Sequence, residues 1–288
     1  MVPDYLAGTI IDMHSHFFPE KLFDSIWEYF ESRNWRIRYQ DYPDGLARTL
    51  TGFGVSRFTV YNYAHKPGMA AELNSWTDAF AKRNPAALPF ATVFPDDVGN
   101  IQMVERLLLE RGFFGIKLQP LVSDFYPTDE RMMEVYRVVV EHGRILAIHA
   151  GTAPIANEYV GADHFEPVME RFPEMKVVVA HMGAFEFDRF FDMAKRYPNL
   201  YLDTSVNFID AEVMRELVRK QEFPPLEIPA DFDREVLLGL SDRLLFGSDY
   251  PNIPYAYNDC VESILALDMG EEFNKAVFFE NARRLLGL

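Results

Sequence analysis

Short apolar runs alternate with longer amphipathic stretches along nearly the whole chain. The apolar runs are rich in β-branched and aromatic residues and predict buried strands, whereas the amphipathic stretches predict helices. The predicted strands cover residues 10–16, 58–61, 88–94, 115–118, 144–149, 176–181, 200–203 and 244–249. The clearest predicted helices cover residues 20–33, 44–51, 69–83 and a stretch capped by Thr128 that runs to Glu141, with Gly143 as its stop signal.

Eight buried strands separated by helix-length segments predict a single (β/α)8 TIM barrel, formed by one domain over residues 1–288. A doubly wound open sheet is the alternative, and it also binds ligands at the carboxyl ends of its strands. An open sheet spreads those ends along a line, whereas a closed barrel gathers them on one rim. The region 223–233, rich in proline and acidic residues, is predicted to be a loop after the seventh strand.

Two histidines close the first apolar run, Ile10-Ile11-Asp12-Met13-His14-Ser15-His16. Side chains of a strand alternate between its faces, so Asp12, His14 and His16 would project in the same direction. Two imidazoles at one strand end suit a divalent metal. Taken alone, the pair is also compatible with an ordinary polar strand end, and Asp12 with either a group that orients one histidine or a hydrogen-bonded core carboxyl.

Three further apolar runs end in a side chain that can bind metal. His149 precedes Ala150-Gly151, His181 precedes Met182-Gly183, and Asp249 precedes Tyr250-Pro251. In a barrel these strand ends share one rim with His14 and His16. The coincidence favours a functional site over core histidines satisfied by backbone carbonyls, which is the structural alternative for His149 and His181.

Composition narrows the classes of partner. The chain has 28 basic and 44 acidic residues, a formal charge of −16, which argues against nucleic acid and anionic membranes as partners. A small anionic substrate is compatible with a few cations gathered at the site. The single cysteine excludes a disulfide framework and a four-thiolate zinc site. We find no signal-peptide pattern and no run long enough to span a membrane, and we therefore expect a cytoplasmic protein.

The motifs together resemble a known superfamily. Asp12-Met13-His14-Ser15-His16, Gly115-Ile116-Lys117-Leu118, Ile148-His149-Ala150-Gly151, Ala180-His181-Met182-Gly183, Phe246-Gly247-Ser248-Asp249-Tyr250-Pro251 and the terminal Asn281-Ala282-Arg283-Arg284-Leu285-Leu286 resemble the amidohydrolase superfamily. Within it the chain looks most like the amidohydrolase-2 branch, which includes aminocarboxymuconate-semialdehyde decarboxylase and lactone-hydrolysing relatives. The resemblance implies that His14, His16, His149 and Asp249 bind one divalent metal ion, commonly zinc, and that His181 stands beside the metal-bound water.

The chemistry of these residue types agrees with that assignment. Three imidazoles and one carboxylate suit Zn²⁺ or another first-row divalent ion and leave positions open for water and substrate. The metal lowers the pKa of bound water, and His181 is a residue type that can take its proton near pH 7. Asp249 can serve as ligand, as base or as both.

The sequence therefore predicts a metal-dependent hydrolase in which metal-bound water attacks the carbonyl of a small organic acid's lactone, amide or ester. The alternative is a nonoxidative decarboxylase of an unsaturated or aromatic carboxylic acid, which needs the same ligands. A noncatalytic metal- or ligand-binding barrel is a third interpretation. His181 and Asp249 argue against it, because storage does not require a group that transfers protons.

Other residues carry more than one interpretation. Lys117 could bridge a second metal as a carbamate, serve the substrate, or pair with a carboxylate such as Asp203. His65 and Lys66 follow the second strand and could contact substrate or form a solvated loop pair. Trp35, Arg36 and Arg38 suit a carboxylated or ring-containing substrate, a contact in a homo-oligomer, or plain surface.

Overall fold

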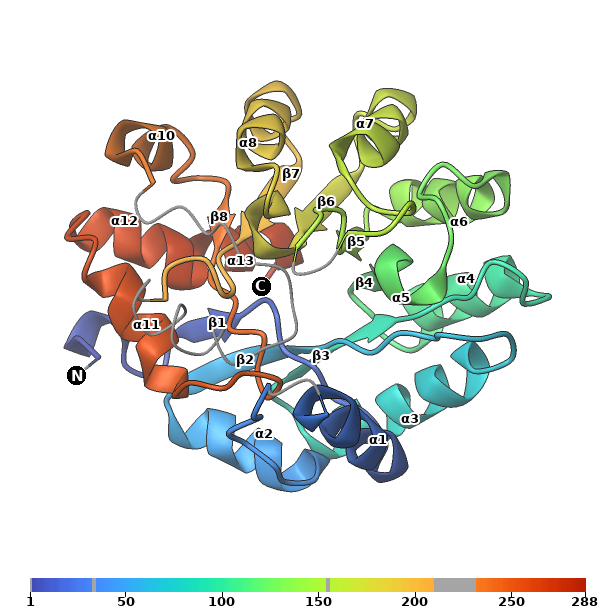
Figure 1. Ribbon diagram of the computed structural model, residues 1–288, viewed down its shortest axis with the longest axis horizontal. Helices are drawn as coiled ribbons and strands as arrows, with labels where there is room; N and C mark the ends of the chain where they lie inside the picture. Colours follow the sequence, from blue (N-terminus) through green and yellow to red (C-terminus); the bar gives the residue numbers. More distant parts are fainter. Residues whose placement is uncertain (1, 33–34, 154–155, 210–231) are drawn as a thin grey trace. The chain divides into compact units, whose positions relative to one another are not determined.

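The computed structural model describes residues 2–32, 35–153, 156–209 and 232–288. Eight strands form a sheet in the order β1 to β8, and the fold is the predicted (β/α)8 barrel (Figure 1). The strands are β1 Ile10–Asp12, β2 Val55–Val60, β3 Ala87–Ala91, β4 Gly115–Leu118, β5 Ile145–Ile148, β6 Lys176–Val179, β7 Leu200–Asp203 and β8 Leu244–Leu245.

Helices separate the strands in chain order. They are α1 Glu20–Glu31, α2 Pro43–Gly52, α3 Ala70–Arg83, α4 Asn100–Glu110, α5 Pro120–Ser123, α6 Glu130–Glu141, α7 Ala162–Arg171, α8 Phe187–Arg196, α10 Arg234–Gly239, α11 Tyr257–Leu265, α12 Glu271–Lys275 and α13 Asn281–Leu286. Among the described residues, no helix is both long and apolar enough to cross a membrane. Residues 223–231 of the predicted loop 223–233 lie outside the described residues.

The chain divides into two compact units, which are described in turn. The first comprises Met1–Thr59 and Asp203–Leu288, and the second Val60–Leu202. The prediction of a single domain remains a prediction.

In the first unit, β1 pairs in parallel with β2, and Asp12 lies opposite Phe58. Beyond β1 the chain runs beside the segment that follows β8. The amide of Met13 donates to the Phe246 carbonyl at 2.8 Å, and the amide of His16 donates to the Tyr250 carbonyl at 2.7 Å. This pairing brings the residues after β1 and after β8 together.

The first strand is shorter than predicted. The sequence pattern extends it to His16, but β1 ends at Asp12. Toward β2, the hydrogen bonds beyond Asp12 involve side chains: the Ser15 amide donates to Thr59 Oγ1 at 3.0 Å, and the Ser15 hydroxyl donates to the Thr59 carbonyl at 2.5 Å. The backbone ladder with β2 therefore ends at Asp12, while His14 and His16 still converge, as shown below.

In the second unit, β3 to β7 pair in parallel. Leu118 of β4 lies opposite Ile148 of β5, and Ile148 lies opposite Val179 of β6, so these three strands end at the same level. Nearly every residue of these strands is buried, which explains why their sequences are continuous apolar runs rather than alternating ones.

The cap of α6 differs from the prediction. The residue at the start of the helix is Asp129, whose carboxylate accepts the backbone N–H of Arg131 at 2.9 Å. Thr128 lies one residue too early. Both residue types cap helices well, so the sequence alone does not choose between neighbours. Gly143 follows the helix with φ +59°, as its predicted role as a stop signal requires.

Candidate metal centre

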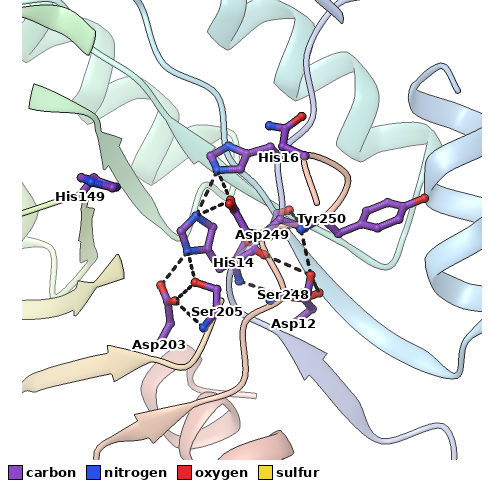
Figure 2. Close-up of polar contacts among 12 residues, drawn as sticks. Asp12, His14, His16, His149, Asp203, Ser205, Ser248, Asp249 and Tyr250 are labelled. Carbon is purple, nitrogen blue, oxygen red and sulfur yellow. Dashed lines mark hydrogen bonds and ion pairs between the residues drawn. The ribbon is translucent and has the colours of Figure 1, made fainter. Parts of the chain in front are cut away.

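Three predicted metal ligands meet in the first unit (Figure 2). His14 Nε2 lies 3.1 Å from His16 Nε2 and 3.4 Å from Asp249 Oδ1. His16 Nε2 lies 3.1 Å from the same oxygen of Asp249. Both histidines are buried, whereas the Asp249 side chain keeps 20% of its surface exposed. Two imidazoles and a carboxylate thus point their ligand atoms at one another.

The hydrogen bond of the other ring nitrogen of His14, Nδ1, determines which nitrogen is free of a proton and can bind metal. Nδ1 lies 2.8 Å from Asp203 Oδ2, and both side chains are buried. A carboxylate only accepts, so Nδ1 carries the proton of neutral His14 and Nε2 carries the lone pair. His14 Nε2 and Asp249 Oδ1 therefore face each other as two acceptors. A cation bound between these two atoms would attract both of them and offset their mutual repulsion.

The spacing fits a first-row divalent ion. Such ions bind nitrogen and oxygen at about 2.0–2.2 Å, so neighbouring ligand atoms lie about 3.0–3.5 Å apart in tetrahedral or octahedral geometry. The three distances, 3.1, 3.4 and 3.1 Å, fall in that range. Three protein ligands on one side also leave positions for substrate and solvent.

The turn after β8 aims Asp249 at the histidines. Asp249 has a left-handed backbone, with φ +64°, and its amide donates to the His14 carbonyl at 2.8 Å. Left-handed backbone is uncommon for residues other than glycine and is often found at functional sites. Gly247, two residues earlier, allows the backbone to approach His14 closely, because a Cβ at this position would lie 2.7 Å from the His14 Cβ.

Asp12 ties the two metal-binding segments together through their backbone. Its Oδ1 accepts the amides of His14 and Ser248, at 3.1 and 3.2 Å, and its Oδ2 accepts the hydroxyls of Ser248 and Tyr257, at 2.6 and 3.1 Å. Burial raises the pKa of Asp12 to about 7, although these hydrogen bonds lower it. Asp12 thus contacts the main chain of His14, and the carboxylate beside the His14 ring is Asp203.

The second unit holds the other predicted site residues. The rings of His149 and His181 lie edge to face with centroids 5.1 Å apart. His149 Nε2 donates to the Ala153 carbonyl at 2.7 Å, so Nδ1 is the nitrogen that carries the lone pair. His181 is half-buried and has φ +54° in the turn after β6, so both predicted catalytic residues, His181 and Asp249, have left-handed backbone.

Lys117 is buried on β4, and its Nζ lies 5.0 Å from the centre of the Tyr61 ring, a cation–π contact. The roles of these three residues remain predictions: His149 as a fourth ligand, His181 as a catalytic group, and Lys117 in any of its three predicted roles.

The weaker candidates lie at the surface. His65 and Lys66 are exposed in the segment after β2, and partial burial together with the charge of Lys66 lowers the pKa of His65. Arg36 and Arg38 are exposed as well. Trp35 donates its indole N–H to the Asn252 carbonyl at 2.8 Å, which fastens this loop to the segment after Asp249. Their contact with substrate remains a prediction.

Sequence reasoning missed the contacts of Asp203 and Ser205 with the His14 ring. The signal was present: β7 ends in Leu202-Asp203-Thr204-Ser205, another apolar run closing on polar side chains. Asp203 was interpreted only as a partner of Lys117. The pattern places a carboxylate at the strand end, but it does not say which neighbouring strand end the carboxylate contacts.

The family is shown by comparison with known proteins. The family model Amidohydro_2, described as amidohydrolase, matches residues 11–288, and the chain belongs to this family. The predicted resemblance to the amidohydrolase-2 branch is thereby confirmed. No curated protein sequence matches the chain.

Solved structures share the fold. An uncharacterised TIM-barrel protein of Bordetella bronchiseptica is 19% identical, with a TM-score of 0.69 over 96% of this chain and 98% of its own. 5-Carboxyvanillate decarboxylase of Novosphingobium aromaticivorans, complexed with manganese and 4-hydroxy-3-methoxy-5-nitrobenzoic acid, is 15% identical, with a TM-score of 0.68 over 100% and 98%. 2,6-Dihydroxybenzoate decarboxylase of Rhizobium is 16% identical, with a TM-score of 0.67 over 97% and 98%.

Proposed function

We propose that the protein is a metal-dependent, nonoxidative decarboxylase of a small aromatic carboxylic acid. The observation that carries this proposal is the convergence of His14 Nε2, His16 Nε2 and Asp249 Oδ1 within 3.4 Å of one another. The choice of reaction is supported by two structural neighbours that match 97–100% of this chain, 5-carboxyvanillate decarboxylase and 2,6-dihydroxybenzoate decarboxylase. The alternative reaction of the sequence analysis is thus favoured over its main one.

The proposal concerns one divalent ion. Zn²⁺ was predicted, whereas the 5-carboxyvanillate decarboxylase structure contains manganese. His14, His16 and Asp249 would hold the ion, with His149 as a proposed fourth ligand. The ion, when bound, supplies a Lewis acid for the oxygen atoms of the substrate.

The chain's own residues have separate tasks in this mechanism. Decarboxylation breaks the bond between the ring carbon and the carboxylate, carbon dioxide leaves, and the electron pair stays on the ring carbon until a proton arrives. We assign the delivery of this proton to His181, because imidazole gains and loses protons near neutral pH. Asp249, held by its backbone turn, orients toward the histidines and is the alternative proton carrier.

Hydrolysis is the second candidate, and the description of the family as amidohydrolase favours it. It would use the same three ligands to direct water at a lactone, ester or amide carbonyl. The two reactions differ in their products: hydrolysis places a solvent oxygen in a carboxylate, whereas decarboxylation places a solvent hydrogen on carbon.

The test uses that difference. The protein, loaded with Mn²⁺ or Zn²⁺, is incubated in deuterium oxide with 2,6-dihydroxybenzoate and 5-carboxyvanillate, and with lactones and aryl amides in oxygen-18 water. We expect carbon dioxide and one deuterium at the vacated ring carbon, and no turnover by His14→Ala. Oxygen-18 in a product carboxylate, without carbon dioxide release from any acid, would transfer the assignment to hydrolysis.

A further inference from the structure

Two residues at and just after the end of β7, Asp203 and Ser205, contact the ring nitrogen of His14 that faces away from Asp249. This nitrogen, Nδ1, lies 2.8 Å from Asp203 Oδ2 and 3.1 Å from Ser205 Oγ. The Ser205 side chain is fully buried, and the Asp203 and His14 side chains are each 1% exposed. Water therefore does not compete for these contacts, and the electrostatic pull of the carboxylate on the imidazole is strong.

The hydrogen atoms in this cluster can be assigned. The Ser205 hydroxyl donates to Asp203 Oδ1 in a short contact, and the Ser205 amide donates to the same oxygen at 3.2 Å. Because the single hydroxyl proton of Ser205 is used there, its Oγ faces the His14 ring as an acceptor. Both neighbours of Nδ1 thus accept its proton, and the opposite nitrogen, Nε2, keeps its lone pair directed at His16 and Asp249.

Two features of the nearby backbone, at Gly247 and Val206, accompany this contact. A Cβ on Gly247 would lie 2.7 Å from the His14 Cβ and 3.2 Å from Asp203 Oδ1, so a side chain at 247 would press on both partners at once. Directly after Ser205, Val206 has φ +71°, a left-handed conformation that is a rare outlier for a β-branched residue. Such conformations persist only where surrounding contacts enforce them.

We propose that Asp203 and Ser205 are the positioning residues of the metal centre: they fix His14 in the Nδ1–H tautomer and orient its Nε2 as a ligand. This inference rests on the proposed function only in requiring that the three-ligand cluster binds a divalent ion. Carboxylates that accept the second N–H of a ligating histidine raise its basicity and strengthen metal binding. Neither residue needs to touch substrate.

The test measures metal affinity rather than turnover. The dissociation constants of Mn²⁺ and Zn²⁺ are measured by competition with a chromophoric chelator, on variants whose folding is checked by thermal unfolding. Asp203→Asn keeps the shape but removes the charge, and we expect affinity to fall about 10- to 100-fold. Ser205→Ala removes the hydroxyl that donates to the Asp203 carboxylate and accepts from His14 Nδ1 but leaves the carboxylate beside the ring, and we expect a loss of about fivefold.

A matched control removes the charge of a carboxylate in the same unit that has a different partner. Asp233 is exposed and caps α10 by accepting the Glu235 amide at 2.7 Å. We expect Asp233→Asn to bind metal like the wild type. A second variant, Gly247→Ala, leaves every charge in place and crowds His14 and Asp203, and it should also weaken metal binding more than the control does.

Long-range nitrogen-15 NMR of the metal-free protein reads the tautomer directly. We expect His14 of the wild type to carry its proton on Nδ1, and the Nε2–H form to become populated in Asp203→Asn. Unchanged affinity and an unchanged tautomer in folded Asp203→Asn would overturn the inference. A wild type that binds neither metal would instead overturn the proposed metal centre, so the two failures are distinguishable.

Discussion

Substitution of His181 tests the proposed proton transfer separately from metal binding. His181 lies in the turn after β6 with left-handed backbone, and its ring contacts that of His149 edge to face. We expect His181→Asn to keep its metal content and fold and to lose about a hundredfold or more in kcat, the usual contribution of a positioned acid or base. Turnover under saturating substrate and metal analysis of the same sample measure both.

A histidine from the same unit serves as the control for that variant. His164 of α7 contacts Tyr126, with their ring centroids 5.1 Å apart, and it follows no strand end, so His164→Asn should leave kcat unchanged. If His181→Asn retained near-normal kcat, His181 would have no part in proton transfer, and Asp249 would become the proton carrier.

At the scale of residues, the candidate metal-binding side chains were predictable because each stands at the end of an apolar run. The rule named His14, His16 and Asp249 together with His149 and His181, the family resemblance proposed which of them bind metal, and the structure brings the first three together. Asp203 was not predictable as the partner of His14. Its contact depends on how β7 and β8 turn at their ends, where Gly247 allows an approach that sequence spacing does not encode.

At the scale of elements, substitutions at the start of helix α6 test whether Asp129 rather than Thr128 caps the helix. Asp129 accepts the Arg131 amide and also bonds the Arg131 guanidinium, and that hydrogen bond holds the pKa of Asp129 below its usual value near 3.8. We expect Asp129→Ala to lower the free energy of unfolding by about 1 kcal/mol at pH 7. Thr128→Ala should change it by less than about 0.5 kcal/mol, as for an ordinary surface position. Urea denaturation measures both.

The charge of Asp129 gives this prediction a pH dependence. Because its pKa is lower in the folded than in the unfolded chain, its charge stabilises the fold above pH 3.8, and this contribution is lost as pH falls through the lowered pKa. Asn caps helices about as well as Asp. The difference between wild type and Asp129→Asn should therefore shrink at acidic pH. A Thr128→Ala loss that exceeds the Asp129→Ala loss would restore Thr128 as the cap.

Element boundaries were less predictable than element order. β4 and β7 have the predicted bounds, because buried parallel strands are continuous apolar runs with sharp polar ends. β1 was predicted four residues too long, since Met13 to His16 keep an extended pattern while their hydrogen bonds go to Thr59 and to the segment after β8. An alternating pattern records which face a side chain takes, and it does not record the hydrogen-bond partner.

At the scale of the whole molecule, eight apolar runs with helix-length spacers predicted a buried parallel sheet, and the expected convergence of side chains at the strand ends favoured the closed barrel over an open sheet. The reaction was not predictable in the same way. Hydrolysis and decarboxylation use the same ligands at the same strand ends, and a fold hosts many reactions. The choice between them rests on products, whereas the metal centre on which both depend can be measured directly.

That measurement is the metal content of the purified protein, determined by mass spectrometry after loading with Mn²⁺ or Zn²⁺ and removal of free metal. We predict about one equivalent per chain for the wild type, the stoichiometry of a mononuclear site. His14→Ala and Asp249→Ala should each lower it sharply. A wild type that is fully active without metal would contradict the account, as would two equivalents that are lost together in Lys117→Ala.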